Sequence, residues 1–229
     1  MTFPSAPLPV PDIVTQIAAG RDVGAVWLNE LGGVTFSVGP AGSGQAEFVK
    51  VYPDEHAALL ATEAQRLTWA VRFLPVPKVI SAGPGWLHTA GLPGRSAVDP
   101  HWVARPVAAA RAIGAGLRTM HDTLPVSDFP FGRPSWIPAD APAADRLVVC
   151  HGDACAPNTL IADDGTCAGH VDLGDLGVAD MWSDLAVATM SLAWDLADVD
   201  GALEAALLDA YGVDPDPVRM AYYRERWEE

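Results

Sequence analysis

The hydropathy pattern changes its period near residue 53, and this change restricts the possible folds more than any other feature. Residues 25–51 are apolar and β-branched around glycine turns, which predicts a hairpin, a turn at residues 39–44 and a third strand. From Pro53 to Phe73, apolar residues recur at intervals of three and four, which is the spacing of a helix. Pro75 and Pro77 end that helix. This order predicts a protein of mixed strands and helices, with a sheet formed by the N-terminal part of the chain.

The remainder of the chain is mainly helical. Two short strands are expected at residues 79–80 and 86–88, followed by a hinge at residues 89–94 that contains two glycines and a proline. Alanine-rich and apolar periodic segments then predict helices, interrupted by a proline-rich connector without regular structure. The predicted helices span residues 106–123, 180–211 with Asp180 as N-cap, and 222–227; the connector spans residues 129–145.

The expected architecture is therefore α+β with two lobes and a cleft between them. An N-terminal antiparallel-sheet lobe would span residues 1–89 and a mainly helical lobe would span residues 90–229. The 229 residues are half apolar, which is enough for a substantial core.

Cysteine content and segment composition indicate the compartment. Three cysteines are an odd number, which argues against a disulfide framework. No run approaches the roughly 18 apolar residues of a membrane helix, and the proline-rich start lacks the charged and apolar segments of a secretory signal. We therefore expect a cytoplasmic protein that does not bind a membrane, either a monomer or a weak dimer.

Charge is concentrated in one half of the chain. The net charge is −15, and residues 151–229 contribute 17 acidic and only three basic side chains. Nucleic-acid binding needs a basic surface, so this class of partner is excluded. An acidic half attracts cations, including polycationic small molecules, although most of these carboxylates are expected to form an ordinary solvated face.

The segment around Asp153 carries the chemistry. Residues 159–162 and 168–171 flank a polar turn and predict a β-hairpin. Asn158 precedes the first of these strands and Asp172 follows the second, so their side chains are expected to be neighbours. A carboxylate and an amide oxygen form a suitable partial shell for Mg²⁺. Asp153 lies five residues before Asn158 and can accept a proton from an attacking hydroxyl group.

Kinase-type phosphoryl transfer uses this arrangement of an aspartate, an asparagine and an aspartate before glycine. Such an arrangement requires a lysine on the third strand and a glutamate on the next helix. Lys50 and Glu63 stand at those places, and Lys50 is one of only two lysines in the chain. The glycines at residues 39–44 are not followed by Lys-Ser/Thr, so a P-loop is excluded.

With these motifs in place, the sequence resembles the aminoglycoside phosphotransferase family, the antibiotic kinases, and particularly its 3′/3″ branch. The resemblance runs over nearly the whole chain, and its most specific parts are His151-Gly152-Asp153, Asn158 and Asp172-Leu173-Gly174. It implies a protein-kinase-like fold, ATP as the phosphate donor with GTP possible, and Mg²⁺. It also implies that Asp153 is the catalytic base and that Asn158 and Asp172 are the metal ligands.

The resemblance assigns nucleotide contacts in the N-terminal lobe. Lys50 corresponds to the family's phosphate-binding lysine and Glu63 to its ion-pair partner. Gly32 and Gly33 fall in the loop that covers the nucleotide. Thr89 and Gly91 fall near the hinge that contacts adenine through the backbone.

Other matches concern the C-terminal lobe. Asp184 corresponds to a buried aspartate that supports the catalytic loop, and His151 supports the same loop by hydrogen bonding. Asp195 and Glu228 fall near carboxylates that bind the amino groups of the acceptor. His121 has no motif around it and receives no role.

Two departures from the family pattern concern the acceptor. The connector at residues 129–147 is shorter than the helical insertion that lines the acceptor pocket in typical members, and Asp175 stands where many relatives have arginine. The predicted function is ATP-dependent phosphorylation of an aminoglycoside hydroxyl group by a 3′-type enzyme. The alternatives are a kinase for a sugar or another small metabolite, and a catalytically weak nucleotide-binding protein.

Overall fold

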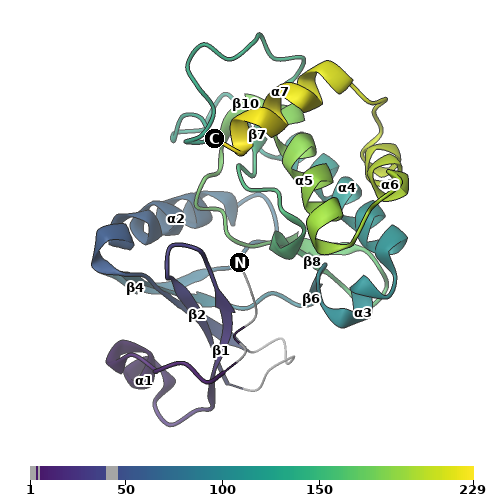
Figure 1. Ribbon diagram of the computed structural model, residues 1–229. Helices are drawn as coiled ribbons and strands as arrows, with labels where there is room; N and C mark the ends of the chain where they lie inside the picture. Colours follow the sequence, from purple (N-terminus) through teal and green to yellow (C-terminus); the bar gives the residue numbers. More distant parts are fainter. Residues whose placement is uncertain (1–3, 5, 40–45) are drawn as a thin grey trace. The chain divides into compact units, whose positions relative to one another are not determined.

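The computed structural model describes residues 4, 6–39 and 46–229 (Figure 1). The chain divides into two compact units. Unit 1 extends to Val71 and includes Pro77–Pro93, and unit 2 comprises Arg72–Val76 and Gly94–Glu229. Of the turn predicted at residues 39–44, residues 40–44 lie outside the described residues, as do residues 1–3 of the proline-rich start.

Unit 1 is built on a five-stranded antiparallel sheet with the order β1-β2-β3-β5-β4. The predicted hairpin, third strand and two short strands are all present. They are β1 (Val23–Leu28), β2 (Val34–Val38), β3 (Glu47–Val51), β4 (Val79–Gly83) and β5 (Trp86–Ala90).

Two helices cover opposite faces of this sheet. The short helix α1 (Asp12–Ala18), which the sequence analysis did not predict, buries Val14 against the face that carries Val49. Adjacent residues in a strand point to opposite faces, so Lys50 lies on the other face, where it pairs with Glu63 of α2 (Ala57–Ala70). A 3₁₀ turn, η1 (Asp54–His56), leads into α2 and occupies the beginning of the helical segment predicted from Pro53.

Unit 2 combines helices with two small sheets. Figure 1 labels all of these elements except strand β9 and the turn η2. Its helices are α3 (Pro100–Val103), α4 (Pro106–Thr123), α5 (Met181–Asp195), α6 (Ala202–Tyr211) and α7 (Pro217–Trp227), with the turn η2 (Ala156–Asn158). Strand β7 (Leu147–Cys150) pairs with β10 (Gly177–Asp180), and β6 (Arg95–Ser96) pairs with β8 (Thr159–Ile161), which pairs with β9 (Cys167–His170). Asp180 caps α5 as predicted, accepting from the backbone N–H of Trp182.

The single helix predicted over residues 180–211 was wrong. The chain breaks at residues 196–201, where Ala197 and Gly201 have positive φ angles. The carboxylate of Asp198 then accepts from the backbone N–H groups of Leu203 and Glu204, and so caps α6. A carboxylate that satisfies the first amides of a helix stabilises a helix start, so Asp198 is a capping residue as well as part of an acidic face.

The last helix begins earlier than residue 222. Asp216 accepts from the backbone N–H groups of Val218 and Arg219, and Pro217 occupies the first turn, where its missing N–H costs nothing. The connector is as irregular as predicted, because residues 124–146 contain no helix or strand. No helix in the described part of the chain has the length and apolar character needed to span a membrane.

Candidate active site

Strand β7 ends at the loop that carries Asp153, and a buried aspartate of α5 holds this loop. The Asp184 carboxylate accepts from the backbone N–H groups of His151, at 2.5 Å, and Gly152, at 3.0 Å. Burial opposes the ionisation of Asp184, but its hydrogen bond to His121 and the nearby positive charge and amides outweigh burial and lower its pKa. The carboxylate therefore stays charged and supports the loop, as the resemblance implied.

The hairpin brings Asn158 and Asp172 to the same end of two paired strands. Thr159 lies opposite His170, and the backbone N–H of Val171 donates to the carbonyl of Asn158 at 2.9 Å. Asp172 follows directly and has a φ of +62°, a conformation that non-glycine residues adopt rarely and that often marks a functional loop. The predicted proximity of the two segments is thus present in the backbone pairing.

Asp153 lies beside this pair. The Nδ2 of Asn158 donates to the backbone oxygen of Asp153 at 2.9 Å. The Oδ1 atom of Asp153 is buried and has no hydrogen-bond partner in the described structure. Burial raises the pKa of Asp153, and the negative charge of Asp172 raises it further. A buried carboxylate oxygen without a donor is costly, and a hydroxyl group brought to it would satisfy it.

These residues fit a divalent cation. Because Nδ2 of Asn158 is used toward Asp153, Oδ1 is the atom that can coordinate a cation, and Asp172 adds a carboxylate from the facing strand end. Oxygen ligands of this kind suit Mg²⁺. The mutual repulsion of Asp153 and Asp172, expressed in the raised pKa of Asp153, is the condition that a nearby cation relieves.

In unit 1, Lys50 and Glu63 form the predicted ion pair. The Nζ of Lys50 lies 2.8 Å and 3.0 Å from the two carboxylate oxygens of Glu63. Glu63 is almost completely buried on α2, and Lys50 reaches it from β3. A carboxylate held on both oxygens fixes the position of the ammonium group, so this pair can present a positive charge at a defined place.

Gly32 and Gly33 form the tight turn between β1 and β2. The Oδ1 of Asn29 accepts from the backbone N–H groups of Leu31 at 3.1 Å and Gly33 at 2.7 Å. Gly32 has a φ of +76°, and a side chain at Gly33 would collide with the ring of Tyr52. The structure thus accounts for both glycines by turn geometry; contact with a nucleotide stays a prediction.

Thr89 and Gly91 lie at and just beyond the end of β5. The N–H of Gly91 donates to the carbonyl of Ala46 at 2.8 Å, and the N–H of Ala90 donates to Lys78. A Cβ at Gly91 would lie 2.6 Å from the oxygen of Ala46, so the two backbones approach closely. Because these two amides are already paired within unit 1, an adenine contact at Ala90 or Gly91 would use carbonyl oxygens.

Asp195, predicted to bind the acceptor, connects to the segment after Asp153 through one serine. The Oγ of buried Ser191 donates to the Asp195 carboxylate at 2.6 Å and accepts from the N–H of Ala156 at 2.7 Å. Glu228 lines a separate hollow of about 360 Å³ between the ends of α5, α6 and α7. This hollow also carries the acidic side chains Asp198 and Glu204 and the exposed ring of Trp194.

Two side chains that support the site could not be predicted from the sequence. His121 links the hydroxyl of Tyr211, at 2.8 Å, to the carboxylate of Asp184, at 3.0 Å, although it received no role. Trp136 of the connector donates from Nε1 to the carbonyl of Gly152 at 2.7 Å. Both contacts join segments far apart in sequence, so no local spacing could have revealed them.

Several known proteins are similar to this chain in sequence and in structure. The phosphotransferase enzyme family matches residues 133–223. An aminoglycoside 3′-phosphotransferase of Streptomyces fradiae is 31% identical over 75% of this chain and 80% of its own length. The solved aminoglycoside 3′-phosphotransferase of type VIII is 27% identical with a TM-score of 0.75, covering 91% of this chain and 93% of its own.

A second solved structure is more distant in sequence. An aminoglycoside 3″-phosphotransferase of Streptomyces rimosus, solved with ADP and streptomycin, is 24% identical with a TM-score of 0.68, covering 95% of this chain and 98% of its own. Together with the sheet of unit 1 and the helices of unit 2, these neighbours confirm the predicted α+β, kinase-like fold.

Proposed function

Because the chain belongs to the aminoglycoside phosphotransferase family, we propose that it transfers the γ-phosphate of ATP to a hydroxyl group of an aminoglycoside. The observation that carries this proposal is the Asp153 carboxylate. It has a buried oxygen without a hydrogen-bond donor, on a loop held by Asp184, beside the strand ends that carry Asn158 and Asp172. The relatives' names and the ADP complex of the Streptomyces rimosus enzyme support both substrates.

In the proposed reaction, Asp153 binds the acceptor hydroxyl through its unpaired oxygen and orients it. The hydroxyl oxygen attacks the γ-phosphorus, and a new P–O bond forms as the bond between this phosphorus and the oxygen bridging it to the β-phosphate breaks. The hydroxyl proton passes to Asp153, and ADP leaves with the bridging oxygen. Positioning of this kind accounts for most of the catalysis in phosphoryl transfer.

The other charged residues offset the negative charge of the phosphates. Asn158 and Asp172 would hold Mg²⁺, which supplies positive charge to the phosphate oxygens when bound. Lys50, fixed by Glu63, would bind phosphate oxygens as a point charge. GTP remains a possible donor, because the phosphate contacts do not depend on the base.

The acceptor would be recognised by carboxylates. Asp195 and Glu228 would bind ammonium groups of the drug, and the excess of acidic side chains in residues 151–229 favours a cationic substrate. We propose the 3′-hydroxyl as the reacting group, on the basis of the Streptomyces fradiae relative. The reaction would take place in the cytoplasm, where ATP is available.

The test is release of ADP from Mg-ATP in a coupled assay with kanamycin, neomycin and streptomycin. We expect turnover that depends on the drug and falls by a factor of about 10² to 10⁴ in Asp153→Ala, because a general base contributes about that much. Nucleotide binding by this variant, measured by calorimetry, should be unchanged. Mass and NMR analysis of the product would identify the phosphorylated hydroxyl.

Phosphorylation of a small metabolite is the second candidate, and the connector favours it. Residues 124–146 contain no helix to line an acceptor pocket, and Asp175 stands where the family resemblance implies an arginine. Sugars and amino alcohols belong in the same acceptor panel. Turnover with one of them and with none of the drugs would establish this candidate. Nucleotide binding without any turnover would instead indicate a catalytically weak protein.

A further inference from the structure

The connector bridges the two loops of the candidate site at a single junction. Trp136 donates from Nε1 to the carbonyl of Gly152, the residue before Asp153, at 2.7 Å. The preceding residue, Ser135, donates from its backbone N–H to both carboxylate oxygens of Asp175, each at 2.9 Å, and from its Oγ at 3.2 Å. Asp175 lies three residues after Asp172 on the other loop.

The two loops touch at the same place. Gly152 has a φ of +85°, and a Cβ at this position would collide with the backbone oxygen of Asp175. The loop of the proposed base and the loop of the proposed metal ligand therefore pack backbone to backbone. Because Ser135 and Trp136 are adjacent, their hydrogen bonds join these loops across the contact.

The indole of Trp136 also contacts the last helix. Its ring packs edge-on against Trp227, with centroids 5.1 Å apart and an interplanar angle of 84°, and against Tyr223 at 6.2 Å and 90°. Trp227 immediately precedes Glu228, a proposed acceptor-binding residue. One side chain of the connector thus links the base loop to the segment that carries an acceptor carboxylate.

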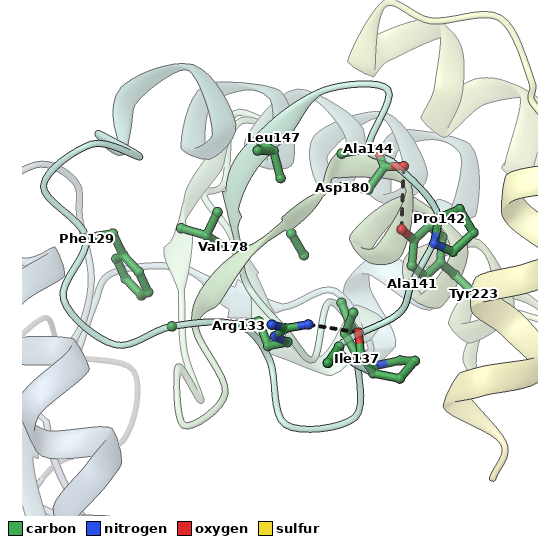
Figure 2. A pocket seen from close by; sticks show the side chains of 14 residues that line it. Phe129, Arg133, Ile137, Ala141, Pro142, Ala144, Leu147, Val178, Asp180 and Tyr223 are labelled. Carbon is green, nitrogen blue, oxygen red and sulfur yellow. Dashed lines mark hydrogen bonds between the residues drawn. The ribbon is translucent and has the colours of Figure 1, made fainter.

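Elsewhere the connector borders a cavity and is held to β10, α5 and α7 by hydrogen bonds of Gly132, Asp145 and Ala143. Figure 2 shows the cavity of about 450 Å³ that residues 129–144 border together with β7, β10 and Tyr223. Where the connector borders this cavity, Arg133 donates to the carbonyl of Pro138 at 2.9 Å, a contact between two residues of the connector. The hydrogen bonds of Ser135 and Trp136 reach the two loops themselves, at Asp175 and Gly152, and through them this segment can position the loops.

We propose that Trp136, with Asp175 as the anchor of Ser135, is a positioning residue for phosphoryl transfer. The connector in this chain aligns the base loop with the loop of Asp172, and Asp175 has an anchoring role at the position where many relatives carry arginine. The inference rests on the proposed function for the reaction and on the hydrogen bonds above for the geometry.

The first test compares Trp136→Phe with a matched control. Phenylalanine keeps an aromatic ring against Trp227 but removes the N–H that holds Gly152. Trp182→Phe is the control, since Trp182 also donates from Nε1, to Asp145 at 3.2 Å, away from both loops. We expect kcat to fall about 10- to 100-fold in Trp136→Phe with KM for ATP unchanged, because small misplacements of reacting groups cost about this much. The control should keep its kcat even if its melting temperature falls.

Amide hydrogen exchange tests the junction without nucleotide or acceptor. Peptides covering residues 148–158 and 171–177 should exchange faster in Trp136→Phe, and also in Asp175→Asn, which weakens the anchor of Ser135. They should be unchanged in Trp182→Phe. If wild-type enzyme turned over none of the acceptors, the proposed function would fail, and exchange would still decide whether the junction holds the loops. Unchanged exchange in both peptides, or a kcat of Trp136→Phe within twofold of wild type, would overturn the inference.

Discussion

At the scale of single residues, Asp153 combines a chemical advantage with a cost in stability. Its Oδ1 is buried without a donor, and burial together with the charge of Asp172 raises its pKa. A raised pKa makes a carboxylate a better proton acceptor, which suits a general base. The same burial disfavours the charged form in the folded protein, so the proposed base destabilises the fold at neutral pH.

Stability measurements can detect this cost. The pKa of Asp153 is higher in the folded than in the unfolded state, so the contribution of this group to stability falls as the pH rises from the unfolded-state pKa through the raised folded-state pKa. Asp153→Asn removes this penalty. In buffer without nucleotide or magnesium at pH 7, we expect it to raise the melting temperature by a few degrees, since about 1 kcal/mol corresponds to about 2–4 °C at this size. The gain should shrink toward pH 3. An equal or lower melting temperature at pH 7 would contradict this account.

Some site residues could be predicted from sequence and others could not, for a physical reason. The neighbourhood of Asn158 and Asp172 follows from a local hairpin, whose strand pairing fixes which residues meet. Trp136, by contrast, acts on Gly152 through one long side chain and an irregular segment. Neither periodicity nor spacing constrains such a contact, so the connector was predicted as a departure from the family and its support of the site was missed.

At the scale of elements, β3 and α2 together position one charge. Strand β3 holds Lys50 on one face of the sheet, and α2 buries Glu63 against it. The lysine side chain alone would be free to rotate. If Lys50 binds phosphates as proposed, fixing it between a rigid strand and a packed helix reduces the conformational entropy lost on binding.

Removing the partner's charge tests this arrangement. We expect Glu63→Gln to raise the Kd for ATP roughly 10- to 100-fold, because hydrogen bonds to charged groups contribute about 1.5–3 kcal/mol. Affinity for the acceptor should not change. Glu47→Gln is the matched control, because Glu47 lies on the same strand and pairs with Arg21 and His88 instead. Calorimetric titration with ATP gives both values, and equal affinities for the two variants would refute a phosphate-binding role for Lys50.

Helix boundaries illustrate what local pattern leaves undetermined. Apolar residues recur at helical spacing through residues 180–211, yet the helix is interrupted. The carboxylates of Asp198 and Asp200 accept hydrogen bonds from the first backbone N–H groups of α6. An aspartate on a helix face and an aspartate at a helix start look alike in composition. The break contributes Asp198 and Gly201 to the hollow that Glu228 also lines, so the error concerned a part of the proposed acceptor region.

At the scale of the whole molecule, charge is distributed unequally between the two proposed substrates. Residues 1–150, which contain the nucleotide-contact candidates, carry 12 acidic and 11 basic side chains, a net charge of −1. Residues 151–229 carry a net charge of −14, with 17 acidic and three basic side chains. A cationic acceptor should therefore be attracted over a distance, whereas the ATP anion should meet a nearly neutral part of the chain.

This asymmetry predicts that kcat/KM responds to salt more strongly for the aminoglycoside than for Mg-ATP. Added salt shortens the screening length from about 30 Å at 0.01 M to about 10 Å at 0.1 M. Between these concentrations we expect kcat/KM for the aminoglycoside to fall roughly tenfold, because steering by a charged surface contributes factors of about 10 to 10³. For Mg-ATP, kcat/KM should change much less, and the nucleotide thus provides the internal control. Steady-state kinetics over a series of potassium chloride concentrations measures both. An equal fall in kcat/KM for the two substrates would indicate a general effect of salt on the enzyme. An unchanged kcat/KM for the drug would mean that the acidic half is an ordinary solvated surface without a role in steering.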